Sequence, residues 1–115
     1  MTSKELNLML ISTFPQLDKA YHEQVDWQEG DDTGSHVVYG DVLVPAMLFL
    51  LNGKRYDTVA EYFDFVESLL VYGDEYASDV VIATVIESIV LSDADESAIL
   101  PLLGPETKKA WNGFE

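Results

Sequence analysis

Residues 56–91 carry two runs of apolar residues at helical spacing, and the only break between them lies at Gly73 and Asp74. In the first run the apolar residues recur at steps of three and four, which places them on one side of a helix. In the second run they cover most of the helix circumference, which is typical of a helix packed on several sides. Because the break is so short, we predict an antiparallel pair of helices.

The first helix of this pair, residues 57–73, has distinct apolar and acidic faces. Its predicted buried residues are Val59, Tyr62, Phe63, Val66, Leu69 and Leu70. Its predicted acidic face contains Asp57, Glu61, Asp64 and Ser68, with Glu67 at the margin and Phe65 and Tyr72 on the boundary. The second helix, residues 74–91, leaves a narrow strip for water that comprises Val80, Thr84, Glu87, Ser88 and Leu91.

The remaining segments also predict helices separated by turn formers. Ser3 is the expected N-cap of a first helix. The second, residues 15–27, is expected to bury Leu17, Ala20, Tyr21, Val25 and Trp27. A polar loop at 28–36 and an extended piece at 37–39 are expected next. Asp41 is the expected N-cap of a third helix, which has Pro45 in its first turn and ends at Asn52 and Gly53. Residues 92–95 cap a short helix, and Pro105 starts the last one.

These elements predict one all-α domain over residues 1–115. The expected architecture is a compact antiparallel bundle of about six to seven helices, built from stacked helical hairpins as in a short α-solenoid. The chain is long enough for a single core without disulfides, and it contains no cysteine.

The acidic residues far exceed the basic ones, with 21 Asp and Glu against 6 Lys and Arg and a net charge of −15. Between residues 20 and 107 the only basic residues are Lys54 and Arg55. Such a surface disfavours direct binding to nucleic acid or to an anionic membrane, because both require positive potential. The simplest reason to keep this uncompensated charge is a partner of opposite sign.

We therefore predict that the acidic face of helix 57–73, its continuation past Gly73 and the acidic loop bind a partner. The candidate residues are Asp57, Glu61, Asp64, Phe65, Glu67, Tyr72, Asp74, Glu75, Tyr76, Asp79, Glu29, Asp31 and Asp32. The competing interpretation is a solvated surface that serves solubility alone. Aromatic residues beside the acids favour an interface.

Catalytic and metal-binding patterns are absent. There is no Gly-x-Ser-x-Gly, no glycine-rich phosphate loop and no His-Glu-x-x-His. His22 and Asp26 lie four residues apart but lack an evident third ligand, and the 29–36 loop lacks calcium spacing. We expect no enzyme activity, no metal and no cofactor. The apolar run 42–51 is too short to span a bilayer, and no secretory signal is evident, so we expect a cytoplasmic protein that is monomeric when free.

Five segments resemble a family of small uncharacterised bacterial helical domains. They are residues 39–45, 64–70, 73–76, 80–89 and 102–111. The resemblance implies an all-helical fold and transfers no catalytic residue. In physical type, a small, acidic, cysteine-free protein is also similar to immunity proteins of bacterial toxin systems, including contact-dependent growth inhibition. That similarity implies binding over the basic cleft of a toxin nuclease domain.

The leading hypothesis from the sequence is thus an inhibitor that neutralises a basic toxin nuclease by electrostatic and steric occlusion. Three alternatives remain open: a nucleic-acid mimic that blocks a DNA-binding protein, an acidic adaptor, and a small metal-dependent enzyme that uses His22 or His36.

Overall fold

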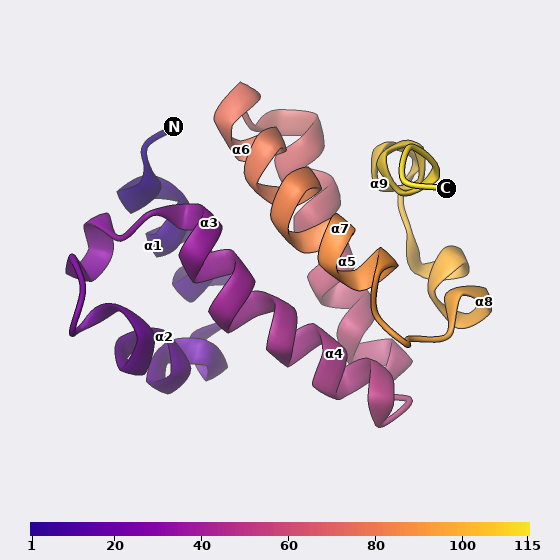
Figure 1. Ribbon diagram of the computed structural model, residues 1–115, viewed down its shortest axis with the longest axis horizontal. Coiled ribbons are helices and arrows are strands. Elements are labelled where there is room, and N and C mark those ends of the chain that lie inside the picture. Colours follow the sequence, from indigo (N-terminus) through magenta and orange to yellow (C-terminus); the bar gives the residue numbers. More distant parts are fainter.

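The computed structural model describes residues 1–115 and contains seven continuous helices and no strand (Figure 1). The α-helical segments are α1 (Ser3–Thr13), α2 (Asp18–Val25), α3 (Ser35–Val38), α4 (Val44–Asn52), α5 (Tyr56–Tyr72), α6 (Glu75–Val80), α7 (Glu87–Val90), α8 (Glu96–Ile99) and α9 (Pro105–Asn112). Short 3-10 turns lie at Pro15–Leu17, Gly30–Asp32 and Leu100–Leu102. The predicted all-α fold is confirmed.

Two π-helical turns join neighbouring α-helical segments into long helices. Tyr39–Leu43 connects α3 to α4, and Val81–Ile86 connects α6 to α7. The α3–α4 and α6–α7 helices contact each other through these turns and form the centre of the molecule. In Figure 1, α1 and α2 lie on one side of the two helices, α8 and α9 lie on the other, and α5 runs behind them.

The α3–α4 helix corrects two predictions. Residues 37–39 are helical rather than extended, and Asp41 lies inside the helix, where its Oδ2 accepts a hydrogen bond from Gln24 at 3.1 Å. The helix continues through Pro45, because in the widened turn before this proline the Val44 N–H donates to the Tyr39 carbonyl. A proline cannot donate to the carbonyl four residues back, and a π turn accommodates that missing bond.

By length and composition alone, the same helix, Ser35–Asn52, is also long enough and apolar enough to cross a membrane. Its mean hydropathy is 1.3, and 44% of it is buried inside the protein. A central helix of a globular fold meets the same two criteria. Here Val38, Leu43 and Met47 are fully buried in the core, so much of the apolar surface of the helix is used for packing.

The N-terminal helices differ from their predictions in detail. Thr2, not Ser3, is the N-cap of α1 and forms a capping box with Glu5, while the Ser3 hydroxyl bonds to the Tyr76 hydroxyl at 2.7 Å. The α2 segment buries Leu17, Tyr21 and Val25, but Ala20 is exposed and Trp27 is 73% exposed. Buried residues four apart form one row, so this short helix contacts the core along a single line.

The antiparallel pair formed by α5 and the α6–α7 helix is confirmed, and Asp74 caps α6 by accepting from the Ala77 N–H. The predicted core of α5 is buried, except that Leu70 is partly exposed. Phe65 is buried rather than at the boundary, because its ring packs against the rings of Phe14 and Tyr39, with centroids 5.4 and 6.3 Å away.

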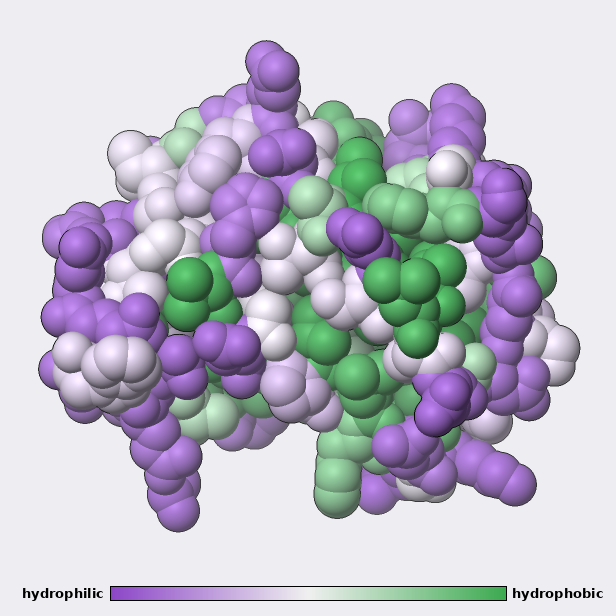
Figure 2. Space-filling view, viewed as in Figure 1, coloured by the Kyte–Doolittle hydropathy of each residue, from purple (hydrophilic) through white to green (hydrophobic).

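The buried and exposed sides of the α6–α7 helix differ from the prediction. Val80 is fully buried and Ala83 is exposed, so the expected water-facing strip is wrong at Val80. The π turn that begins at Val81 shifts the register of the helix, and a constant 100° wheel cannot represent this shift. Figure 2 shows apolar side chains gathered on the near face where the α3–α4 and α6–α7 helices lie side by side, with hydrophilic side chains at the edges.

Candidate functional site

The outer side of α5 carries a row of carboxylates, which we call the α5 stripe: Asp57, Glu61 and Asp64. All three side chains are exposed, and none lies within 4.0 Å of a basic nitrogen. Steps of four and three residues keep them on one line along the helix. The row continues towards the C-terminal end of α5, where Val71 is 49% exposed and Tyr72 is 88% exposed. The structure therefore brings together free carboxylates and an exposed aromatic ring.

Glu67, also on α5, has an internal role and does not belong to this row. Its carboxylate accepts hydrogen bonds from the Thr107 N–H and hydroxyl, both at 2.8 Å, and from the Glu106 N–H at 3.2 Å. These donors lie in the first turn of α9, whose N-cap is Gly104 and therefore supplies no side chain. Burial acts to raise the pKa of Glu67, but the hydrogen bonds from Thr107 and Glu106 outweigh it and hold the pKa below 4.5.

Gly104 provides the space for this contact. A Cβ atom built on Gly104 would lie 2.5 Å from the Glu67 Cδ and Oε1 atoms. Glu67 is therefore the N-terminal cap of α9, provided by another helix. Phe65 is also removed from the predicted interface, since its ring lies in the core.

The predicted residues after Gly73 are mostly engaged within the protein. Asp74 caps α6 and pairs with the amino group of Met1, and these two contacts lower its pKa. Tyr76 bonds to Ser3, and Asp79 lies 3.6 Å from the His36 Nε2. The His36 Nδ1 in turn lies 2.7 Å from the Thr84 hydroxyl. Of this group, only Glu75 is exposed without a polar partner, so it is the one predicted residue here that stays free for a partner.

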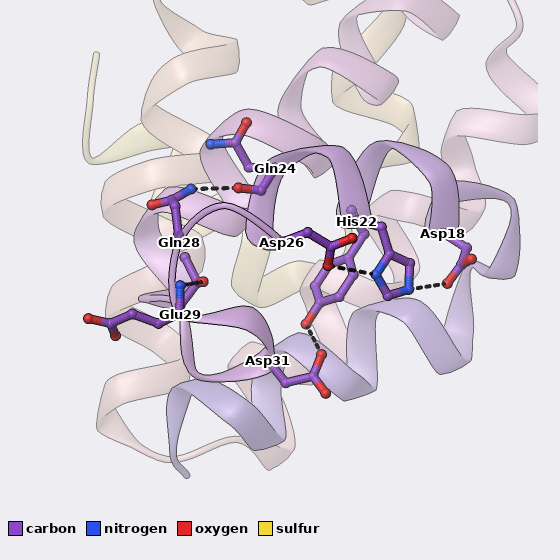
Figure 3. A network of polar contacts seen from close by, with 9 residues as sticks. Asp18, His22, Gln24, Asp26, Gln28, Glu29 and Asp31 are labelled. Carbon is purple, nitrogen blue, oxygen red and sulfur yellow. Dashed lines mark hydrogen bonds and ion pairs between the residues drawn. The ribbon is translucent and has the colours of Figure 1, made fainter.

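A second acidic surface lies on α2, and we call it the α2 surface: Asp18, Glu23, Asp26 and the exposed Trp27. Figure 3 shows His22 between two of these carboxylates, with Asp26 at 3.1 Å and Asp18 at 3.3 Å from its ring nitrogens. The hydrogen bond with Asp26, together with the charges of Asp18, Asp26 and Asp31, raises the pKa of His22 above 6.5. Glu23 lies 4.0 Å from Lys19. Each carboxylate here has a nearby basic group.

The predicted acidic loop is fixed to the rest of the protein. Asp31 accepts a hydrogen bond from the Tyr21 hydroxyl at 2.7 Å (Figure 3), and burial together with this bond raises the pKa of Tyr21. The buried Asn7 side chain donates to the carbonyls of Asp31 and Thr33 at 3.0 and 2.7 Å. Glu29 and Asp32 remain exposed. The loop is therefore an ordered acidic corner next to α2.

An apolar depression of about 140 Å³ lies between α1 and the C-terminal end of α5. Its walls are Met1, Met9, Ser68, Leu69, Tyr72 and Gly73. Sequence reasoning missed this feature, although Leu69 belongs to a predicted apolar face, because the depression exists only where two helices meet. It also missed the exposure of Trp27 and Phe49, which are 73% and 78% exposed. No group of three or more His, Asp or Glu side chains is placed to hold a metal ion.

Comparison with known proteins gives one positive result. No curated protein matches the chain, and no solved structure matches it. One family model, described as "Domain of unknown function (DUF7674)", matches residues 7–115. The match begins at the buried Asn7 in α1 and includes every later helix from α2 to α9. The chain therefore belongs to the DUF7674 family, here an all-helical domain.

Proposed function

We propose that this chain is an inhibitor that binds a basic protein partner through α5, and that the partner is a toxin nuclease domain. The observation that carries the proposal is the α5 stripe, whose three exposed carboxylates form no ion pair within the protein. Only Asp57, at the first turn of α5, has basic residues beside it, Lys54 and Arg55. On an isolated surface helix, carboxylates at such spacing repel one another and weaken the fold slightly. A partner with Lys and Arg residues would relieve that repulsion.

The mechanism follows from the charge and the geometry. Asp57 and Asp64 are seven residues apart, which is about 10 Å along the helix. Carboxylates in a line on a rigid helix can occupy the positions that substrate phosphates take against the basic residues of a nuclease cleft. The net charge of −15 would accelerate the encounter, and the exposed Tyr72 would slow dissociation. A nuclease whose cleft is covered in this way cannot admit nucleic acid.

An immunity role sets further expectations. The inhibitor would act in the cytoplasm, where the toxin would meet its nucleic-acid substrate, and it would be a monomer until it binds the partner. It would require no cofactor, since occlusion involves no chemical step.

The test uses the product of the reading frame next to the gene of this protein, purified as its basic C-terminal domain. We expect a one-to-one complex by size-exclusion chromatography, and loss of nuclease activity on plasmid DNA when the two proteins are mixed. The association rate should fall by at least about tenfold between low and high salt, because screening weakens attraction between opposite charges. A domain that forms no complex, or one that associates at a rate independent of salt, would contradict the proposal.

A further inference from the structure

The apolar depression at the C-terminal end of α5 has more hydrophobic wall residues than the other hollows of the surface. Four of its six wall residues are hydrophobic, including two methionines and Tyr72. Methionine side chains are flexible and polarisable, which suits them to contacts with partner side chains of varied shape. The hollow over α2 is instead lined by charged groups around the single hydrophobic residue Trp27. Of these two hollows, the α5 depression is the one with mainly hydrophobic walls.

Carboxylates stand on several sides of this depression. Asp64 lies one helical turn before Ser68 on α5, and Glu5 lies one turn before Met9 on α1, where it accepts from the Thr2 N–H in the capping box. Residues four apart are neighbours on a helix surface, so both carboxylates lie next to the wall residues. Glu75 follows two residues after Gly73, and all three side chains are exposed. Exposed carboxylates therefore lie beside the depression, and the Met1 ammonium in its wall is already paired with Asp74.

The volume sets the size of the group that fits. Apolar cavities of roughly 150 Å³ in protein cores accept a molecule the size of benzene. A depression of about 140 Å³ can accordingly receive one aliphatic side chain or one small ring, and no more.

We propose that this depression receives a single aliphatic side chain of a basic protein partner, and that Lys or Arg residues flanking this side chain meet Asp64 and Glu75. The proposal rests on the proposed function for the class of partner, and adds the motif that the partner must present. These two carboxylates attract the flanking cations, and burial of the aliphatic group holds the complex together.

The experiment uses the full chain and two short synthetic peptides that contain Lys residues around one central position. The peptides are identical except that the central residue is Leu in one and Ser in the other. We expect the Leu peptide to bind about tenfold more tightly in calorimetry, since part of a leucine side chain leaves water.

The three methionines provide a local readout in the same samples. Met1 and Met9 line the depression, whereas Met47 is fully buried in the core. With methyl-labelled methionine, the Leu peptide should shift the signals of Met1 and Met9 and leave that of Met47 in place. The Ser peptide should leave all three signals nearly unchanged.

Three variants separate the depression from the surrounding surface. Ser68→Leu fills the depression and Tyr72→Ala removes one wall, so each should abolish the preference for the Leu peptide. Phe49→Ala changes an exposed side chain on α4 that does not line the depression, and should retain the preference. Circular dichroism and thermal unfolding confirm that each variant is folded.

The possible outcomes distinguish this inference from the proposed function. Equal, salt-sensitive binding of both peptides would overturn the inference and leave the proposed function standing. A preference for Leu that survives in Ser68→Leu would also overturn it. If neither peptide binds at low salt, both proposals fail, because a surface that attracts a basic protein must also attract a basic peptide.

Discussion

The two acidic surfaces of this protein have similar composition but differ in how their carboxylates are used. On α2, Asp18 and Asp26 flank His22, and Glu23 lies near Lys19. On α5, Asp57, Glu61 and Asp64 form no ion pair within 4.0 Å, although Asp57 lines a surface hollow together with Lys54 and Arg55. Compensated carboxylates contribute less to the external potential, whereas free carboxylates keep their full effect on an approaching charge. The comparison shows that net charge alone does not locate an interface.

The same difference between engaged and free carboxylates occurs within the single helix α5, at Glu67. It lies three residues after Asp64 on α5, yet its carboxylate caps α9 and is unavailable to a partner. Sequence spacing placed it at the margin of the acidic face, and the fold of the C-terminal segment determined its role. Free and structural carboxylates can therefore alternate along one helix.

The largest expected effect is on the association rate, when three carboxylates are reversed to Lys on one acidic surface or on the other. Reversal of Asp57, Glu61 and Asp64 to Lys should slow association with the basic partner by about 100-fold, because attraction at the contact becomes repulsion. Reversal of Asp18, Glu23 and Asp26 alters the net charge equally and should slow association by less than about tenfold. Stopped-flow measurements at fixed ionic strength compare the two. Equal slowing would show that only the net charge matters and would remove the distinction between the surfaces.

A change at Asn7 tests whether the acidic corner next to α2 is held by a buried network. The Asn7 amide donates to two loop carbonyls and its oxygen accepts from Ser35 at 2.9 Å, so Asn7→Ala leaves several buried groups without partners. We expect the free energy of unfolding to fall by about 2 kcal/mol in urea titrations. Hydrogen exchange should increase in residues 29–34 and remain unchanged in α5. Asn52→Ala, at an exposed position, is the control and should change stability by less than about 0.5 kcal/mol.

A comparison of Glu67 with Glu61 separates the structural and free carboxylates of α5. Glu67→Gln should lower stability by about 1 kcal/mol at pH 7, since a charged acceptor at the N-terminus of α9 is lost. The folded-state pKa of Glu67 is depressed below 4.5, so its contribution is present above that pH and disappears as the pH falls through the folded pKa. Glu61→Gln should have no measurable cost. Urea titrations at neutral pH and near about pH 3 provide the measurement.

Gly104→Ala supplies an independent check of the same contact. The new Cβ would displace the Glu67 carboxylate, and stability should fall by about 1 kcal/mol. In a Glu67→Ala background the same change should cost much less, because the carboxylate is already absent. Strict additivity of the two changes would contradict the capping role.

The smallest expected effect concerns His22. Its pKa is raised above 6.5 mainly by the hydrogen bond with Asp26, so its contribution to stability is complete below pH 6.5 and is lost as the pH rises through the folded pKa. Asp26→Asn should move the midpoint of the His22 ring titration back towards 6.5, as measured by NMR. An unchanged midpoint would mean that the Asp26 carboxylate and the His22 ring are not paired. Asp26 on the α2 surface would then be as free as the carboxylates of the α5 stripe.

Local signals in the sequence were sufficient where the relevant interactions are local. The α5 helix, the break at Gly73, the start of the next helix at Asp74 and the first turn of α9 at Pro105 all agree with the structure. Turn residues and capping side chains act within a few residues, so their effect is independent of the rest of the fold. Asp41 misled the prediction because an Asp before an apolar run with a proline in its first turn is also the pattern of a helix start.

The sequence by itself determined that the chain forms helices around one core and that its surface is strongly acidic, because periodicity and charge are properties of nearby residues. Only the tertiary structure decided which carboxylates are free, since a capping or pairing contact such as that of Glu67 with Thr107 joins residues forty positions apart. The burial of Phe65 and the depression beside Met9 have the same origin. Each depends on packing between helices, and no single helix encodes it.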